Sequence, residues 1–254
     1  MRSRFLAVIL SLLIPLLLFC GSQKVRPIPS AEEQFQIAKR EYQKKDWSEA
    51  VIEFQKLIFN YPGFARADSA QFLLAMSYFK DKEYPLAAGE FNRVVSSFPT
   101  SPLTDDALFY TGVCALEQSP GAHLDQRSTY LAVERLEIFL EEHPESELVP
   151  QAKEKLFEAR FKLAEKTYKT GELYVKMKDY DAALIYLNEV LNLYGDTDWA
   201  AKALFLIGEL YSKQKKFDEA TKTFQEFVEK YPQDKLTNKA KKKIDDIGKK
   251  ISGS

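Results

Sequence analysis

The sequence predicts an all-α fold: a right-handed α-solenoid of five stacked helical hairpins, closed by a C-terminal capping helix. One spacing pattern predicts it, and its clearest copy lies near the C-terminus. Ala220 is followed by Phe224 four residues later and by Pro232 twelve residues later. Gly208 precedes Ala220 by twelve residues. The two small residues let antiparallel helices approach closely, the aromatic ring fills the space between them, and proline ends the second helix.

This pattern occurs five times along the chain. Its central small residues are Ala50, Ala87, Ala132, Ala183 and Ala220. Successive copies are separated by 37, 45, 51 and 37 residues. The pattern resembles the tetratricopeptide repeat, which has a similar signature and a period of about 34 residues. Because a single helix pair cannot bury its own apolar face, we expect the hairpins of residues 31–232 to stack into one elongated body with a concave inner surface.

Residues 1–19 have the signature of a secretory signal peptide. Two arginines precede an apolar run that is shorter than the roughly 20 residues a membrane-spanning helix needs. The run ends in Leu17-Leu18-Phe19-Cys20-Gly21, which resembles a bacterial lipobox. This resemblance predicts that Cys20 is acylated, with palmitate among the chains, and that several acyl chains anchor the protein stably in a membrane. A plain signal peptide and an uncleaved anchor are the alternatives.

Residues 20–30 form the predicted lipidated tether. The segment contains two prolines and lacks a helical period, so we expect an extended chain that reaches up to roughly 30 Å from the lipid. Gly21 and Ser22 after the cysteine resemble the pattern of lipoproteins sent to the outer membrane. Ser30, with Glu33 three residues later, is a capping-box signature that marks the start of the first helix.

Two repeats contain extra residues. The third has an eight-residue excess between its helices, from Gln118 to Arg127, where Ser119-Pro120-Gly121 predicts a surface loop. The fourth has a 14-residue excess before its small residue, within Val149 to Met177. Because fourteen residues are almost four helical turns, they extend the helix without rotating its apolar face. We therefore predict one long helix there.

Residues 233–254 are predicted to form a capping helix and a tail. Apolar residues recur in this segment at helical spacing, opposite a face rich in lysine. They are Leu236, Ala240, Ile244, Ile247 and Ile251. A helix of this kind covers the last hairpin and is polar on its outer side, as the terminal unit of a solenoid must be.

Composition argues against several classes of function. The net charge of −1 argues against a nucleic-acid-binding protein, which needs a basic face. Two histidines and two cysteines form no catalytic constellation and no metal-ligand spacing. Cys114 lies in an apolar run and is predicted to be a small buried hydrophobe. We therefore predict a non-enzymatic protein that uses no metal and no cofactor.

An aromatic stripe recurs on the first helices of the repeats, which are predicted to line the inner surface. Each first helix also contains a small residue, such as Ala38, Ala75, Gly171 or Gly208. Three residues before it stand Phe35, Phe72, Phe109, Tyr168 and Phe205. The stripe either packs against the next helix pair or lines a groove for an extended or helical peptide. On the second interpretation, the partner-binding residues are Phe35, Tyr42, Phe72, Phe79 and Phe109.

The inner surface is predicted to become polar toward the C-terminus. The residues of repeats four and five that indicate this change are Glu172, Lys176, Glu209 and Lys213. We expect this end of the solenoid to contact a charged protein surface.

The mature chain resembles the BamD (YfiO/ComL) family of outer-membrane assembly lipoproteins. The resemblance rests on Cys20, on the five hairpins, and on several segments of the repeats. These segments are Ala70-Gln71-Phe72-Leu73-Leu74-Ala75 with Tyr78-Phe79-Lys80, Asp125-Gln126-Arg127, His143-Pro144-Glu145-Ser146, and Leu163-Ala164-Glu165 through Tyr174 to Asp181-Ala182-Ala183. Two places depart from the family: Phe19 in the lipobox, and Tyr194-Gly195 where Tyr-Pro is expected.

The resemblance implies a scaffold of the β-barrel assembly machine, lipid-anchored in the outer membrane and facing the periplasm. It implies that the C-terminal repeats hold the barrel insertase BamA through its periplasmic POTRA domains. It further implies that the N-terminal repeats recognise unfolded outer-membrane protein segments or other assembly lipoproteins. Two alternatives use the same solenoid: a pilotin or secretion lipoprotein that docks a secretin, and a periplasmic cell-envelope adaptor. Fold alone does not separate them.

Overall fold

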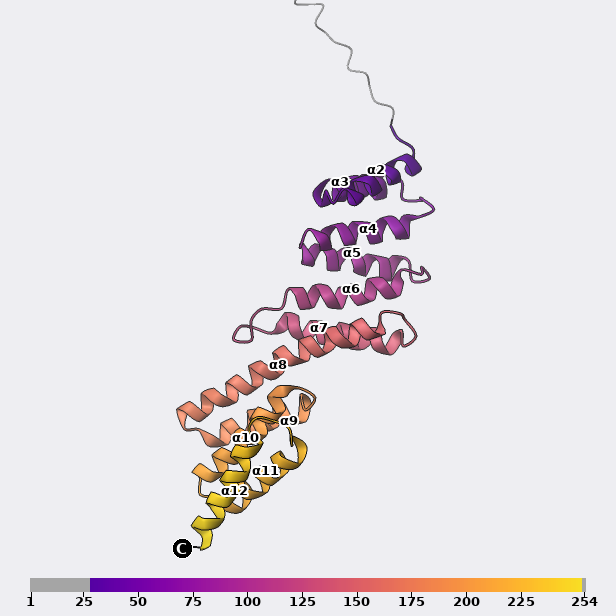
Figure 1. Cartoon of the computed structure of the whole chain (residues 1–254). Helices are drawn as coiled ribbons and strands as arrows, with labels where there is room; N and C mark the ends of the chain where they lie inside the picture. The colour runs from indigo at the N-terminus through magenta and orange to yellow at the C-terminus, as the bar shows by residue number, and fades with distance from the viewer. Residues whose placement is uncertain (1–27, 253–254) are drawn as a thin grey trace, which may run out of the picture.

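The computed structural model describes residues 28–252, and within this range every regular element is a helix (Figure 1). The helices are α2 (Ala31–Gln43), α3 (Trp47–Asn60), α4 (Ala67–Lys80), α5 (Tyr84–Ser97), α6 (Thr104–Glu117), α7 (Arg127–Glu142), α8 (Val149–Met177), α9 (Tyr180–Leu193), α10 (Asp198–Lys213), α11 (Phe217–Lys230) and α12 (Thr237–Ser252). The predicted signal peptide, Cys20 and most of the predicted tether lie outside these residues.

The helices pair into five successive hairpins, each packed on the next. The pairs are α2–α3, α4–α5, α6–α7, α8–α9 and α10–α11, and α12 packs on α11. Figure 1 shows them stacked along one elongated body. The all-α class and the stacking of helical hairpins are therefore confirmed. None of the helices between residues 28 and 252 is long and apolar enough to cross a bilayer.

Small residues set the spacing within each hairpin, as the pattern predicts. A Cβ atom added at Gly208 would stand 2.7 Å from the ring of Phe224, and one added at Gly171 would stand 3.0 Å from Leu187. In the third hairpin, the eight-residue insertion displaces the small position to Gly112, whose added Cβ would lie 2.8 Å from Leu136. Helix pairs meet this closely only where one side chain is absent.

The turns inside four of the hairpins contain a lysine in the left-handed region. Lys45, Lys82 and Lys178 have φ of 64°, and Lys215 has φ of 61°. A side chain in this conformation brings Cβ close to the following carbonyl, which costs roughly 1–2 kcal/mol per residue. The turn has to be short so that the two helices can pack against each other, and this packing outweighs the cost.

The predicted N-terminal cap is confirmed at the first helix. The Ser30 hydroxyl accepts from the Glu33 backbone N–H at 3.3 Å, and the Glu33 carboxylate accepts from the Ser30 N–H at 2.8 Å. The Tyr61 hydroxyl donates to the Pro29 carbonyl, so the chain before α2 is tied to the end of α3. This contact places the start of the solenoid beside the loop that follows the first hairpin.

The predicted long helix is confirmed as α8, with 29 residues. Its N-terminal half packs on α6 and α7, where Ala152 and Ala159 are buried. Its C-terminal half packs on α9 and α10. In Figure 1, α8 runs obliquely from the upper hairpins to the lower ones. The helix therefore belongs to both halves of the solenoid and joins them.

The loop from Gln118 to Gln126, predicted from its turn residues, is held by a polar network. The buried Gln126 amide donates to the carbonyls of Gly121 at 2.9 Å and Leu124 at 3.2 Å, and it accepts from the Thr129 hydroxyl at 2.7 Å. Lys166 of α8 donates to the His123 carbonyl at 3.4 Å. These bonds satisfy the backbone groups of a segment that has no helix of its own.

Candidate protein-binding faces

The predicted aromatic stripe divides into a buried part and a half-buried part. Phe35 and Phe109 are each 3% exposed and lie in the core. The Phe35 ring packs against Phe54 at 6.2 Å between centroids and lies under the Arg66 guanidinium. Phe109 packs against Phe139 at 5.7 Å, and Val149 and Ala152 at the start of α8 belong to the same core cluster. At these two positions the side chains pack in the core, which fits the packing interpretation of the stripe.

Tyr42, Phe72 and Phe79 are half-buried, and they gather around Tyr110 of the third hairpin. The Tyr110 ring lies 6.4 Å from that of Phe72 and 5.3 Å from that of Phe79. Tyr42 packs in the same cluster. One aromatic cluster thus joins three consecutive hairpins, and the half-buried rings keep an edge available to a partner. Binding at these residues remains a prediction.

The sequence pattern misses Tyr110, although this residue is the centre of the cluster. Burial first, and then the nearby Asp106 carboxylate, raises the pKa of the Tyr110 phenol. Burial, with Tyr110 as the second cause, also raises the pKa of Tyr42. Both phenols therefore stay neutral hydrogen-bond donors at physiological pH. Tyr110 follows Phe109 directly, and the stripe counts one residue per repeat, so the second aromatic is overlooked.

Two buried polar pairs, 37 residues apart, also lie outside the predicted set. The Gln34 amide donates to the Glu53 carboxylate at 2.5 Å, and the Gln71 amide donates to the Glu90 carboxylate at 2.6 Å. The separation equals the step between the first two repeats, and this equality is a signal that sequence comparison of the two repeats would have found. A pair of this kind satisfies two polar groups between neighbouring helices.

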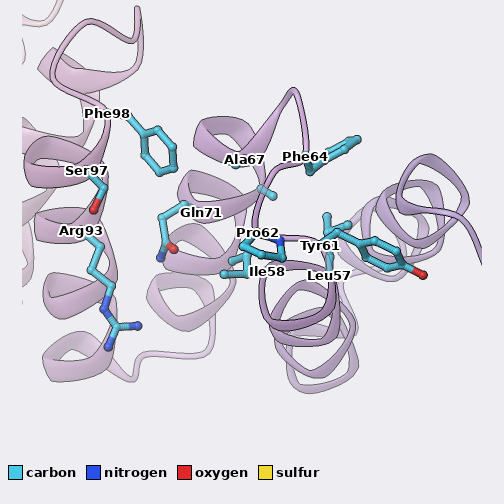
Figure 2. A pocket seen from close by; sticks show the side chains of 11 residues that line it. Leu57, Ile58, Tyr61, Pro62, Phe64, Ala67, Gln71, Arg93, Ser97 and Phe98 are labelled. Carbon is cyan, nitrogen blue, oxygen red and sulfur yellow. The ribbon is translucent and has the colours of Figure 1, made fainter.

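A cavity of about 210 Å³ opens between the first two hairpins (Figure 2). Leu57, Ile58 and Pro62 form one wall, and Ser97 and Phe98 stand opposite. The lining also contains polar groups, among them the buried Gln71 amide, the exposed Arg93 guanidinium and the Ser97 hydroxyl. The cavity shares no residue with the Tyr110 cluster. Its size and lining suit one apolar side chain of a bound segment.

Near the C-terminus, lysine ammonium groups of α10 and α12 lie over aromatic rings of α10. The Lys202 ammonium lies 3.6 Å from the centroid of the Trp199 ring, and that of Lys239 lies 4.8 Å from the Phe205 ring. The Glu209 carboxylate forms ion pairs with Lys239 at 3.4 Å and with Lys243 at 3.2 Å. Cation–π pairs at partly exposed sites contribute about 0.5–1 kcal/mol, which favours these positions of the ammonium groups. Of the residues predicted to make this end polar, Glu172 and Lys176 lie on α8, and Glu209 and Lys213 lie on α10.

The joint between the two halves of the solenoid is built around Arg160 of α8. Its guanidinium donates to the Leu193 carbonyl at 2.7 Å and to the Asp196 carboxylate at 2.8 Å. The bond from Arg160 holds the pKa of Asp196 below its usual value. Beside it, burial and the neighbouring Tyr130 raise the pKa of Tyr194 to about 12. The end of α9 is therefore bound to the middle of α8 at a defined place.

Cys114 is fully buried, and burial raises the pKa of its thiol to about 12. A thiol with this pKa is not nucleophilic at neutral pH, so the residue is a packing element as predicted. Between residues 28 and 252, no three His, Cys, Asp or Glu side chains gather to hold a metal ion. Cys20 lies outside that range, so its acylation stays a prediction.

Five stacked helical hairpins, with small residues at the predicted close approaches, define an α-solenoid of the tetratricopeptide type. The model of the family described as "YfiO: Outer membrane lipoprotein" matches residues 29–218. The chain therefore belongs to the YfiO family of outer membrane lipoproteins, and the resemblance seen in the sequence is confirmed.

Solved structures of tetratricopeptide proteins resemble the chain at low sequence identity. The TPR2AB domain of yeast Sti1, in a complex with pHSP90, has a TM-score of 0.42 and 16% identity, covering 80% of this chain and 78% of its own. MamA of Desulfovibrio magneticus RS-1 has a TM-score of 0.37 and 15% identity, with 80% and 97% covered. A thermophilic TPR protein of Thermus thermophilus, TTC0263, has a TM-score of 0.36 and 17% identity, with 85% and 99% covered. No curated protein matches the chain.

Proposed function

We propose that this protein is a non-enzymatic, lipid-anchored scaffold of the outer-membrane β-barrel assembly machine. Its C-terminal repeats bind the periplasmic POTRA domains of a BamA-like barrel insertase. Its N-terminal repeats hold segments of unfolded outer-membrane proteins or other assembly lipoproteins. The observation that carries the proposal is the match to the YfiO outer membrane lipoprotein family over residues 29–218.

The N-terminal hairpins provide the chemistry for a partly folded segment. Tyr42, Phe72, Phe79 and Tyr110 present ring edges from three hairpins. Aromatic anchors of this kind dominate binding energy in protein interfaces, and they tolerate varied partner sequences. The buried Phe109 ring supports this cluster, because its centroid lies 5.2 Å from that of Tyr110, whereas Phe35 packs on Phe54 within the first hairpin. An extended segment across the cluster would contact several rings at once.

The C-terminal hairpins provide the chemistry for a folded, charged partner. Lys202 and Lys239 are held over aromatic rings, and Glu209 is held between two lysines. Charges fixed in this way lose little conformational entropy on binding, so they favour one orientation of a partner surface of opposite charge. A POTRA domain with acidic groups opposite α10 and α12 fits this face.

Anchoring and the two faces act together. Lipid at Cys20 restricts the scaffold to a layer near the membrane, which raises its effective concentration at a membrane-embedded partner. The long α8 then holds the two faces at a fixed separation. A substrate segment bound at the N-terminal hairpins is thereby kept near the insertase without any chemical step.

The test is a mild-detergent pull-down of the full lipoprotein with mass spectrometry of the proteins that co-purify. We expect a POTRA-containing barrel protein with the wild-type chain and at least a tenfold loss of it when Lys202→Glu and Lys239→Glu are combined. Lys241→Glu with Lys242→Glu is the matched control, because it makes the same charge change on exposed residues of α12. Recovery of a secretin would instead favour a pilotin, and recovery of division or peptidoglycan proteins would favour a cell-envelope adaptor.

A further inference from the structure

The cavity between the first two hairpins is the middle part of a longer groove, which is bounded by α3, α4 and α5. A hollow on one side of the cavity shares four lining residues with it: Phe64, Ala67, Ser97 and Phe98. A second hollow shares three: Ile58, Gln71 and Arg93. The exposed Phe59 ring borders this second hollow. The groove therefore has room for a chain that continues on both sides of the central cavity.

Gln71 is a buried polar side chain in this groove with unused hydrogen-bonding capacity. It is 5% exposed, and its Nε2 donates to the Glu90 carboxylate at 2.6 Å. Figure 2 shows its side chain extending into the space between Arg93 on one side and Ile58 and Pro62 on the other. A carboxamide has two N–H donors and an accepting oxygen. Among residues 28–252 no other group bonds to this carboxamide, so one N–H and the oxygen are left for a ligand.

The equivalent residue of the first hairpin does not share this unused capacity. Gln34, 37 residues before Gln71, is equally buried and lies outside the groove. Its Nε2 donates both to the Glu53 carboxylate at 2.5 Å and to the Glu53 carbonyl at 3.1 Å. Buried polar groups are normally bonded in this way. The donor of the carboxamide is thus used up where there is no groove, and it is left over where the groove opens.

The chemistry of the groove identifies its occupant as an extended, uncharged peptide. An N–H donor beside an accepting oxygen matches the C=O and N–H of one residue in an extended backbone. The cavity, at about 210 Å³, is smaller than the roughly 300–1,000 Å³ of pockets for drug-sized ligands, and it suits one aliphatic or aromatic side chain. An anionic occupant finds no free cation, because the Arg93 guanidinium donates to both oxygens of Glu90 at 2.9 Å.

We propose that this groove binds an extended, neutral peptide segment, whose backbone pairs with the Gln71 carboxamide and whose apolar side chain fills the cavity. The groove shares no residue with the cluster around Tyr110, so it is a peptide site separate from the contact proposed there. The inference goes beyond the scaffold function. It depends neither on the anchor at Cys20 nor on the charged C-terminal hairpins.

The test is photo-crosslinking of a blocked, uncharged peptide to the full chain in lipid nanodiscs. The probe is acetyl-Ser-Thr-photoleucine-Thr-Ser-amide, in which photoleucine is the diazirine analogue of leucine. Mass spectrometry locates the crosslinks, and we expect them on the groove residues Ile58 and Phe98. The same peptide with leucine or phenylalanine at its centre should compete with the probe, and the peptide with asparagine there should not.

Two variants test the carboxamide and the cavity separately. Gln71→Met removes the carboxamide at nearly constant length and should reduce crosslinking about fivefold, with Gln34→Met as the matched control at the equivalent position. Ser97→Leu fills the cavity from its exposed rim without replacing a buried residue, and it should reduce crosslinking by a similar factor. Ser96→Leu makes the same change on an exposed neighbour outside the lining and should leave crosslinking unchanged.

Crosslinks confined to Phe72, Phe79 and Tyr110, or no crosslinks at all, would overturn the proposal. Equal losses in Ser97→Leu and Ser96→Leu would overturn it as well. A dimer in analytical ultracentrifugation that Ser97→Leu converts to a monomer would show that a second copy fills the groove in place of a peptide. The pull-down of a POTRA-containing protein is read independently and should be the same for Ser97→Leu as for wild type, so failure of the crosslinking leaves the scaffold function intact.

Discussion

At the residue scale, the closeness of each helix pair depends on a missing side chain. We predict that Gly208→Ala destabilises the fold by about 1–3 kcal/mol, because the new methyl group would overlap the buried Phe224 ring. Urea unfolding followed by circular dichroism measures the change. Gly89→Ala is the control, since that glycine lies inside α5 with open space around it. The control should stabilise the protein by up to about 1 kcal/mol, and an equal loss in both variants would contradict the close-approach explanation.

At the lysines with positive φ, we predict that a substitution stabilises the protein. Lys45→Gly should stabilise the protein by about 0.5–1 kcal/mol, because glycine adopts positive φ without the clash that lysine suffers. Lys44→Gly is the matched control, since Lys44 has φ of −71° and the same charge is removed. The thermal midpoint should rise in the first variant and fall or stay constant in the second. A rise in both would point to charge and not to backbone conformation.

At the element scale, the joint at the middle of α8 is sensitive to acid. The pKa of Asp196 is lowered in the folded chain by its bond to Arg160. That bond therefore stabilises the protein at pH values above 3.8, the ordinary pKa of the carboxyl group. That stabilisation is lost as the pH falls through the lowered pKa. We predict that wild type and Asp196→Asn differ in free energy of unfolding at neutral pH, and that this difference disappears as the pH falls below 3.8 and through the lowered pKa of Asp196. Because Asp196 is half exposed, the difference should be small.

Urea titrations at a series of pH values provide the measurement. Asp198→Asn is a suitable control, because Asp198 is an exposed carboxylate close in sequence that lies in the first turn of α10. A gap between wild type and Asp196→Asn that stays constant down to acid pH would show that the carboxylate does not act through its charge.

Helix positions were predictable because they follow from local spacing, and the packing of the stripe was not. Gly208 with Phe224, and Gly171 with Leu187, meet at the offsets that the repeat defines. The burial of Phe109, in contrast, depends on the start of α8, which covers it from the following hairpin. Contacts between hairpins depend on how far each is rotated on the next, and spacing within one hairpin contains no information about that rotation.

At the scale of the whole molecule, stability should be local to neighbouring hairpins. Each hairpin contacts mainly the next one, so a loss at one end should not reach the other. We predict that ending the chain before Thr237 increases amide hydrogen exchange in α10 and α11, because α12 covers Phe205 and Phe227. Exchange in α4 and α5 should be unchanged. A uniform increase along the chain would contradict the nearest-neighbour description and would indicate one cooperative unit.

Because α8 is continuous, its number of residues sets the orientation of the C-terminal hairpins relative to the N-terminal ones. With 29 residues and a rise of about 1.5 Å each, the helix is a rod of about 43 Å. One residue added near its middle would rotate one half of the solenoid relative to the other by about 100°. Seven added residues would restore the original orientation to within about 20°. Relatives that differ in this helix by other numbers of residues would face their partners from another side.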